Sequence, residues 1–281
     1  MTTGPASVLA APVIAVLGLG EAGSLFATDL MTCGATVRAF DPRVPAPEPA
    51  IGCAGDADAA RGGRLILSLT SAHEAQETLR QAAPGIAAGA IYADLNTGSP
   101  RLKQTLAEAA ERAGAVFVDV ALMAPVPGHG LRTPMLACGP GAEDYARILR
   151  PLGADVTVLA GPPGTAATRK LLRSVFYKGL AAAVTESLRA ASAAGCADWL
   201  REDIARVLAD ASPDTVDRLE QGSMRHASRR ADEMKAAGDM LDDLGVPPRI
   251  ARASQAWLGQ LSAEQLIFGG PVTPAGQITP G

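Results

Sequence analysis

The sequence has few aromatic residues and no large excess of charge of one sign. It contains 5 Phe, 3 Tyr and 2 Trp in 281 residues, and 25 Lys and Arg against 29 Asp and Glu give a formal net charge of −4. Few rings are therefore available to stack on bases, and no general electrostatic attraction draws the chain to nucleic acid or to an anionic membrane. We expect neither class of partner.

Cysteines at metal-ligand spacing, a basic leader and a long hydrophobic run are also lacking. The four cysteines, at positions 33, 53, 138 and 196, include no CxxC pair, so we expect no metal site and no disulfide framework. Met1–Pro12 has no Lys or Arg ahead of its small apolar run, and the longest apolar stretch, Val8–Gly20, is too short to span a bilayer. These features favour a cytoplasmic protein.

Glycine and proline are abundant, with 30 Gly and 21 Pro, and the chain length predicts about two domains. From Val13 to Leu159, short aliphatic runs alternate with stretches of helical composition, which is typical of βαβ units around a largely parallel sheet. The expected strands are Val13–Leu17, Thr36–Phe40, Leu65–Leu69, Ile91–Asp94, Val116–Val120, Met135–Cys138 and Val156–Leu159. The expected helices between them are Ala22–Cys33, His73–Ala83, Pro100–Ala113 and Ala142–Leu149.

Strand signals stop after the Gly161–Gly164 cluster of glycine and proline. Thr165–Ala194 is then a long run of helix formers without proline, and further helices are expected at Asp198–Leu208, Pro213–Met224, Ala227–Leu244 and Arg249–Gln260. The predicted fold class is α/β, with a doubly wound Rossmann domain at residues 10–162. A long interdomain helix joins it to an all-helical substrate and dimerisation domain at 163–266, and residues 267–281 are expected to form a mobile tail.

A glycine-rich turn stands in the context that dinucleotide binding requires. Gly18-Leu19-Gly20-Glu21-Ala22-Gly23 directly follows an apolar strand and opens a predicted helix. Gly18 permits a tight turn, Gly20 lets the backbone approach a pyrophosphate, and Gly23 lets the helix pack close to the strand. These six residues are the predicted pyrophosphate contacts, although Glu21 also suits the first turn of any helix. A glycine turn without a ligand is the alternative.

Asp41 ends the second predicted strand. A carboxylate at this place can accept hydrogen bonds from both hydroxyls of the adenosine ribose. It would also repel a 2′-phosphate, which favours NAD over NADP, although Arg43 could offset that repulsion. NAD is therefore the predicted cofactor, with NADP as the alternative.

With this loop, the acid and the two-part layout, the chain resembles the β-hydroxyacid dehydrogenase family over nearly its whole length. That family includes 6-phosphogluconate and 3-hydroxyisobutyrate dehydrogenases, with imine reductases as divergent relatives. The resemblance implies a nicotinamide-dependent oxidoreductase. It also implies that Thr70 and Ser71 border the cofactor and that Asn96 and Thr97, in Asn96-Thr97-Gly98-Ser99-Pro100, lie near the nicotinamide.

Two motifs of the family are altered in this chain. The substrate loop, usually Asp-Ala-Pro-Val-Ser-Gly-Gly, corresponds to Asp119–Gly128, where Met123 stands in place of the serine and both following glycines are missing. The Met123–Pro127 pattern, together with Ser228–Met234, is similar to a less characterised 6-phosphogluconate dehydrogenase-like branch. Met123 is the residue that the resemblance assigns to substrate binding.

The family's catalytic element, Gly-x-Gly-x-x-x-Lys-x-x-Asn-Asn, corresponds to the run that begins at Gly164. This run keeps the lysine as Lys170, but Arg173 and Ser174 replace the two asparagines. The resemblance therefore implies that Lys170 is the catalytic residue and that Ser174 lies at the substrate.

The helix that follows Gly164 combines a polar stripe with apolar residues. At about 100° per residue, Lys170, Ser174, Tyr177 and Lys178 fall on one side, while Leu171, Leu172, Val175, Phe176 and Leu180 fill much of the remainder. We therefore expect a largely buried helix whose polar stripe faces a cleft between the domains. Lys170 would exchange the substrate's hydroxyl proton during hydride transfer, and Lys178 would either orient an anionic substrate or lower the pKa of the neighbouring lysine. Two solvated lysines on an exposed helix face are the alternative.

Three functions are compatible with these residues. The leading hypothesis is an NAD(P)-dependent dehydrogenase acting on CH–OH groups, which transfers a hydride between the cofactor and a small hydroxy acid or sugar-acid-like substrate. Imine or carbonyl reduction is the second, because Met123 and the neighbouring prolines suit a less polar substrate. The third, motivated by the missing asparagine pair, is a catalytically silent NAD-binding protein. The thin core of the helical half predicts a homodimer.

Overall fold

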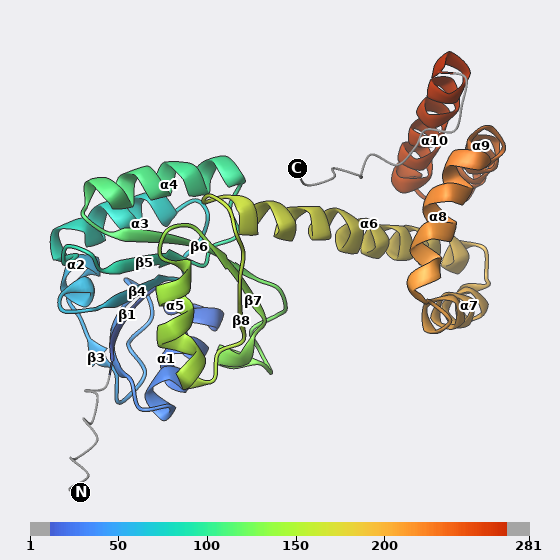
Figure 1. Ribbon diagram of the computed structural model, residues 1–281. Coiled ribbons are helices and arrows are strands. Elements are labelled where there is room, and N and C mark those ends of the chain that lie inside the picture. Colours follow the sequence, from blue (N-terminus) through green and yellow to red (C-terminus); the bar gives the residue numbers. More distant parts are fainter. Residues whose placement is uncertain (1–11, 269–281) are drawn as a thin grey trace, which may run out of the picture. The chain divides into compact units, whose positions relative to one another are not determined.

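The computed structural model describes residues 12–268, and the chain divides into two compact units between Arg173 and Ser174. The first unit contains a sheet with the strand order β3-β2-β1-β4-β5-β6-β7-β8 (Figure 1). All neighbouring strands are parallel except β6 and β7. This doubly wound sheet confirms the predicted Rossmann architecture. The strands are β1 (Val13–Leu17), β2 (Thr36–Phe40), β3 (Ile51–Gly52), β4 (Leu65–Ser68), β5 (Ile91–Asp94), β6 (Val116–Leu122), β7 (Met135–Cys138) and β8 (Val156–Val158).

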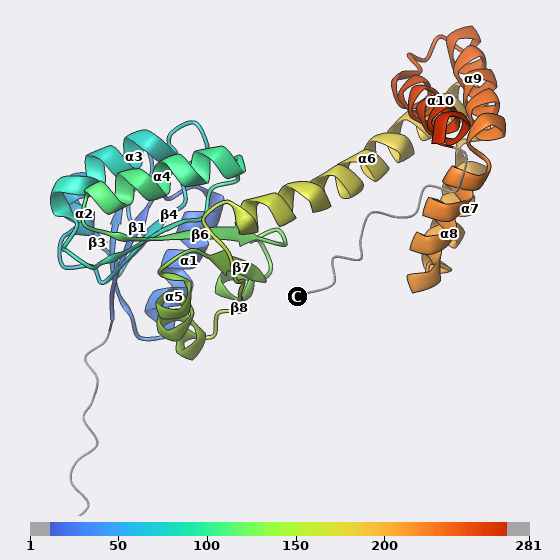
Figure 2. The ribbon, with the colours of Figure 1, turned by 45° about the horizontal axis from the view of Figure 1, so that its top comes forward.

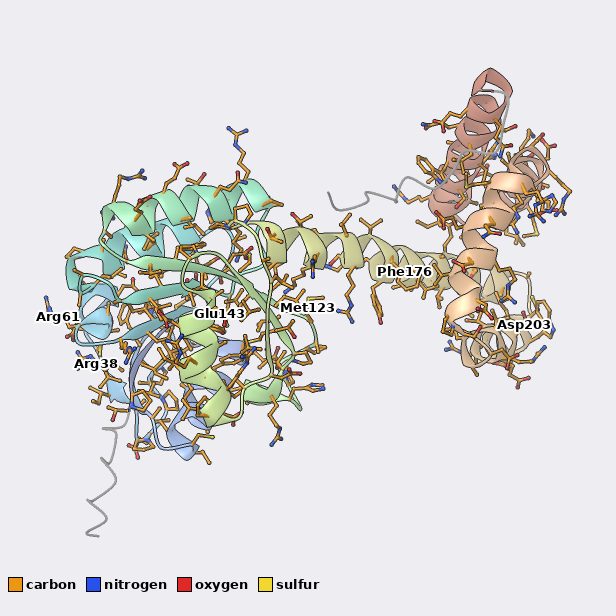
Figure 3. All side chains as sticks on the ribbon, in the orientation of Figure 1. Arg38, Arg61, Met123, Glu143, Phe176 and Asp203 are labelled. Carbon is orange, nitrogen blue, oxygen red and sulfur yellow. The ribbon has the colours of Figure 1, made fainter. Side chains whose placement is uncertain are left out.

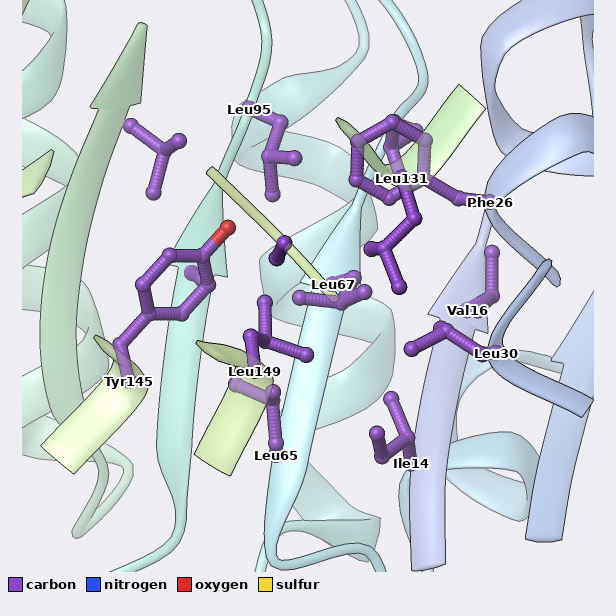
Figure 4. Close-up of a cluster of buried hydrophobic side chains, with 14 of the residues drawn as sticks. Ile14, Val16, Phe26, Leu30, Leu65, Leu67, Leu95, Leu131, Tyr145 and Leu149 are labelled. Carbon is purple, nitrogen blue, oxygen red and sulfur yellow. The ribbon is translucent and has the colours of Figure 1, made fainter. Parts of the chain in front are cut away.

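Helices cover both faces of this sheet (Figures 1 and 2). On one face lie α1 (Glu21–Thr32) and α5 (Ala142–Leu149), and on the other lie α2 (Asp56–Ala60), α3 (Ala75–Ala82) and α4 (Pro100–Arg112). Figure 4 shows part of the first of these two cores, where apolar side chains of the strands meet Phe26 and Leu30 of α1 and Tyr145 and Leu149 of α5. Packing of helices on both faces holds the sheet in place, and it therefore also holds the carboxyl ends of the strands in place.

The expected elements of the first unit are present, with ends within two residues of their predicted positions. The sequence did not predict β3 and α2, which have only 2 and 5 residues. Elements this short carry no periodic pattern that a sequence could display.

The second unit contains the later part of α6 (Thr165–Ala193), with α7 (Ala197–Ala209), α8 (Pro213–Arg225), α9 (Ala227–Asp243) and α10 (Arg249–Phe268). The Glu186 carboxylate of α6 accepts hydrogen bonds from the backbone N–H groups of Ile250 and Ala251, both at 2.8 Å, and so holds the start of α10. Helix α10 runs to Phe268, two residues past the residue at which the sequence analysis ends the helical domain. The rest of the predicted tail, residues 269–281, lies outside the described residues.

The division between the units falls later than the Gly/Pro cluster at which the sequence placed it, because the first turns of α6 pack on the sheet. Ala166 and Ala167 are buried, and Ala166 belongs to a small apolar cluster with Ala121, Cys138 and Leu159. No helix within residues 12–268 combines the length and the apolar composition needed to cross a membrane.

Candidate functional site

The glycine-rich turn lies at the carboxyl end of β1 and leads into α1. Gly18 has φ +90°, and a Cβ added to it would lie 2.6 Å from the carbonyl oxygen of Leu69. A Cβ on Gly23 would lie 1.9 Å from the carbonyl oxygen of Gly18, so α1 packs directly on the backbone of the turn. A Cβ on Gly20 would meet no protein atom within 4 Å. The fold therefore requires glycine at positions 18 and 23, whereas at Gly20 the space is open.

The first turn of α1 begins beside this open space. Gly20 is the N-cap residue and Glu21, which is exposed, is the first helical residue. The first N–H groups of a helix have no partner inside the helix, and with the helix dipole they favour an anion. The side chain of Leu19 is instead buried in the core, so this residue offers only its backbone to the site.

Asp41 lies where the sequence predicted it, directly after β2, and its carboxylate is held by backbone N–H groups. Oδ2 accepts from Leu19 at 2.9 Å, and Oδ1 accepts from Arg43 at 2.8 Å and from Val44 at 3.1 Å. Burial alone would raise the pKa of Asp41, but these hydrogen bonds and the Arg43 guanidinium together lower it. The carboxylate is therefore ionised and fixed against the glycine turn.

A pocket of 640 Å³ extends from the glycine turn past Asp41 to α2 and α3. Four carboxylates line it, and its one lining cation, Arg43, lies 3.6 Å from the carboxylate of Glu74. Hydrogen bonds from Arg80 and Gln81 lower the pKa of the lining residue Glu77 to about 2. The pocket is therefore electronegative. Its lining residues are Gly18, Gly20, Phe40, Asp41, Pro42, Arg43, Val44, Asp56, Leu69, Thr70, Ser71, Glu74, Glu77, Thr78 and Gln81.

Polar residues also gather at the carboxyl ends of β4 and β5. The Asn96 amide nitrogen lies 2.6 Å from Asp94 Oδ1, 3.1 Å from Ser68 Oγ and 3.4 Å from Thr70 Oγ1, and its two hydrogens are shared among these three oxygens. Thr97 is exposed beside this cluster. The Ser71 hydroxyl donates to Glu74 at 3.0 Å, so its side chain is engaged at the start of the turn leading to α3. The structure thus brings Thr70 and Asn96 together.

Beneath this cluster, a buried ion triad connects β5, α4 and β6. Lys103 Nζ of α4 lies 2.6 Å from Asp94 Oδ2 and 3.2 Å from Asp119 Oδ1, with all three side chains at most 1% exposed. Asp119 Oδ2 accepts hydrogen bonds from the N–H groups of Gly164 at 2.9 Å and Ala167 at 3.1 Å. One carboxylate therefore links the triad to the start of α6.

Lys170 is half-buried on α6, one turn beyond this anchored start. Arg173, on the same helix, donates a hydrogen bond from Nη1 to the carbonyl oxygen of Met123 at 2.5 Å. The half-buried Met123 side chain packs against the cluster around Ala166. Arg173, which replaces an asparagine of the family motif, thus ties α6 to the predicted substrate loop.

Ser174 and Lys178 follow on α6 but belong to the second unit. The expectation of a largely buried helix is wrong for the single chain, because Leu172 is 66% exposed, Val175 75% and Phe176 61%. Figure 3 labels Phe176 on α6. The composition of the sequence predicted that α6 is rich in apolar residues, but it could not predict whether another part of the same chain buries them.

Several residues of the site were not predicted. Asp56 lies in a helix too short to detect, and Lys103 has the exposed-looking sequence context of an ordinary amphipathic helix. The sequence analysis named Asp119 only as the first residue of the substrate-loop motif and gave it no role of its own. The signal that could have found the triad is an acid in each of two neighbouring apolar strands, Asp94 at the end of β5 and Asp119 opposite it in the middle of β6, because two such buried acids require a cation.

A Rossmann sheet with a glycine turn after β1 and an acid after β2 defines the NAD(P)-binding fold of oxidoreductases. The chain belongs to the family of the NAD-binding domain of 6-phosphogluconate dehydrogenase, whose model matches residues 13–159. A second family model, a domain of unknown function (DUF1932), matches residues 191–261.

Known proteins resemble the chain at modest identity. The 3-hydroxyisobutyrate dehydrogenase of Pseudomonas aeruginosa is 28% identical over 190 residues, which are 62% of each protein. A conserved protein described as structurally similar to 3-hydroxyacid dehydrogenases is 26% identical, with a TM-score of 0.58 over 90% of this chain and 98% of that one. The imine reductase of Myxococcus stipitatus in complex with NADP⁺ is 18% identical, with a TM-score of 0.76 over 90% of this chain and 95% of that one. The chain spans less than two thirds of the length of the curated relatives that it matches.

Proposed function

We propose that this protein is an NAD-dependent oxidoreductase that transfers a hydride between the nicotinamide and a small hydroxy acid or sugar-acid-like substrate. The observation that carries dinucleotide binding is the open space at Gly20: the fold does not need glycine there, but a pyrophosphate does. The likeness to a 3-hydroxyisobutyrate dehydrogenase supports a hydroxy acid as the substrate class.

The backbone of Gly18–Gly23 would hold the pyrophosphate and Asp41 the adenosine ribose. Thr70, Ser71, Asn96 and Thr97 would border the nicotinamide half. The four carboxylates of the pocket favour NAD over NADP, because each would repel a 2′-phosphate and Arg43 already pairs with Glu74. Bound NAD supplies the acceptor for the hydride.

Lys170 is the proposed general acid and base. When an alcohol is oxidised, its C–H hydrogen leaves as hydride and its O–H proton passes to the neutral amine of Lys170; reduction reverses both transfers. The anchored start of α6 supports this role, since Asp119 fixes the turn before the lysine. Met123, Ser174 and Lys178 are the proposed substrate contacts.

The test is a panel of hydroxy acids, sugar acids, ketones and imines assayed with NAD and NADP in both directions. With the substrate that it identifies, Lys170→Ala should lower kcat by about 100-fold or more while leaving the Kd for NAD⁺ unchanged. Arg169→Ala, at the exposed neighbouring position, is the matched control and should keep full activity. Full activity of the Lys170→Ala variant would remove the lysine from the mechanism. Cofactor binding without turnover of any compound would instead favour a silent NAD-binding protein.

Imine or carbonyl reduction is the second candidate. It is favoured by Met123, whose side chain packs in an apolar cluster where the family loop has a serine. Imine reductases are also among the structures that share the fold. Turnover of imines or ketones with NADPH, without oxidation of hydroxy acids, would select this function over the first.

A second copy of the chain is the proposed partner. Val175 and Phe176 expose 75% and 61% of their surface on α6, and the second unit also contains an apolar groove of 710 Å³ lined by Leu180, Trp199, Ile204, Val207, Met234 and Met240, among others. A convex apolar helix and a concave apolar groove on one chain are complementary, so two copies related by a twofold axis can cover both surfaces. We therefore propose a homodimer.

A cytoplasmic location is also proposed. All four cysteines are free, and Cys33 and Cys196 are exposed. Unpaired exposed thiols suit a reducing compartment.

A further inference from the structure

Asp56 is a buried carboxyl group of the pocket to which the proposed function assigns no direct contact with the dinucleotide. It is 8% exposed and lines the pocket from the first position of α2. No residue in the range 12–268 donates a hydrogen bond to its side chain. Burial, followed by the charges of Asp41 and Glu77, raises the pKa of Asp56 to about 6, so it is mostly ionised at neutral pH. An ionised, buried acceptor without a donor is costly unless a ligand supplies one.

The start of α2 is held firmly in place. Arg38 Nη2 of β2 donates to the Asp58 carbonyl oxygen at 2.7 Å and to Asp58 Oδ1 at 2.9 Å, and Figure 3 shows Arg38 beside α2. In addition, a Cβ on Gly85 would lie 1.9 Å from the carbonyl oxygen of Ala57, so the backbone at Gly85 packs directly on the backbone of α2. The carboxyl group of Asp56 therefore cannot swing out of the pocket with its helix.

Sheet order indicates which part of a dinucleotide would meet Asp56. Proceeding outward from β1, the strands are β2 and then β3, with Ala39 opposite Gly52. The glycine turn after β1 is the proposed pyrophosphate contact, and Asp41 after β2 is the proposed ribose contact. The next position outward is the segment after β3, where α2 begins with Asp56. Beyond the ribose lies the adenine ring.

We propose that Asp56 accepts a hydrogen bond from the 6-amino group of adenine and so makes the pocket selective for an adenine dinucleotide. This inference rests on the proposed dinucleotide site. A carboxylate only accepts hydrogen bonds, and the exocyclic amine is a donor. A purine with a carbonyl oxygen in place of the amine would place an acceptor against the carboxylate.

The test compares NAD⁺ with nicotinamide hypoxanthine dinucleotide, in which an oxygen replaces the 6-amino group. Their Kd values are measured by calorimetric titration of the full chain. Wild-type protein should bind NAD⁺ about tenfold more tightly or better, the effect of one hydrogen bond to a charged group. Asp56→Ala should bring the ratio of the two Kd values close to 1. Asp56→Asn should do the same without loss of volume, because a side-chain amide can turn to match either ring.

Glu77→Gln is the matched control, because it removes a carboxylate charge from the same pocket. It should change both affinities together and keep the wild-type ratio. A wild-type ratio near 1, or an unchanged ratio in both Asp56 variants, overturns the inference while NAD⁺ binding stands. Failure of the wild-type protein to bind either dinucleotide overturns the proposed function as well.

Discussion

The glycines of the turn after β1 serve different needs. Gly18 and Gly23 are required by the protein itself, because a side chain at either position would collide with backbone atoms. Gly20 has open space where its side chain would be. A substitution at Gly18 or Gly23 should therefore affect the stability of the fold, whereas a substitution at Gly20 should affect mainly the proposed ligand binding.

Gly23→Ala should destabilise the first unit, since its Cβ would lie 1.9 Å from the carbonyl oxygen of Gly18 and α1 would have to move. We expect a loss of about 2–4 kcal/mol in the free energy of unfolding, as for other overpacked buried positions. Urea denaturation followed by circular dichroism measures it. An unchanged midpoint would show that α1 does not pack on the turn in this way.

Asp56 should lower stability at neutral pH. Its pKa in the folded protein, about 6, is above the ordinary value of 3.8, so the folded state binds the proton more tightly. The stabilisation that this proton gives is complete below about pH 4 and is lost as pH rises through 6. Asp56→Asn should therefore raise the free energy of unfolding above pH 6 by up to about 3 kcal/mol. The difference should vanish near pH 4. Equal stabilities at pH 7 would contradict the assigned environment.

At the scale of elements, the start of α6 depends on a side chain from β6. Asp119 is fully buried, accepts hydrogen bonds from Gly164 and Ala167, and forms an ion pair with Lys103. The same network continues through Asp94 to Asn96, at the nicotinamide side of the proposed site. The sheet thereby positions the helix that carries Lys170.

Asp119→Ala should destabilise the protein by about 3–5 kcal/mol, because it leaves two buried N–H groups unpaired and removes one partner from a buried cation. Asp119→Asn keeps one acceptor oxygen and should cost clearly less. Thermal and urea unfolding of both variants provide the comparison. A mild effect of the alanine variant would mean that the start of α6 is held in another way.

The sequence predicted the longer elements well and the site unevenly. Helices such as α1 and strands such as β1 repeat their apolar pattern often enough to be recognised, and the turn at Gly18 is defined by local geometry. The surroundings of Asp56 and of the triad at Lys103 depend on which distant segments the fold brings together. No local spacing in the sequence indicates these long-range contacts. The exposure of α6 likewise depends on its surroundings and not on its own pattern.

At the scale of the whole molecule, the exposed apolar surface of α6 argues for a dimer. Phe176→Asp should shift the protein from dimer to monomer in light scattering coupled to size-exclusion chromatography at micromolar concentration. The single chain should tolerate the charge, because Phe176 is 61% exposed in it. Arg101→Asp, on the exposed side of α4, is the control and should leave the mass unchanged. A monomeric wild-type protein would contradict the proposed homodimer.

The most direct test of the central claim is a calorimetric titration of NAD⁺ into the wild-type and Gly20→Ala proteins. A Cβ at position 20 touches nothing in the protein, so the variant should unfold within about 1 kcal/mol of the wild type, the usual effect of alanine at a helix N-cap. The same Cβ would occupy the space proposed for the pyrophosphate. We predict saturable binding of NAD⁺ by the wild type and binding at least about tenfold weaker by the variant, a difference of about 1.4 kcal/mol. Equal affinities, or no binding by the wild type, would contradict the account.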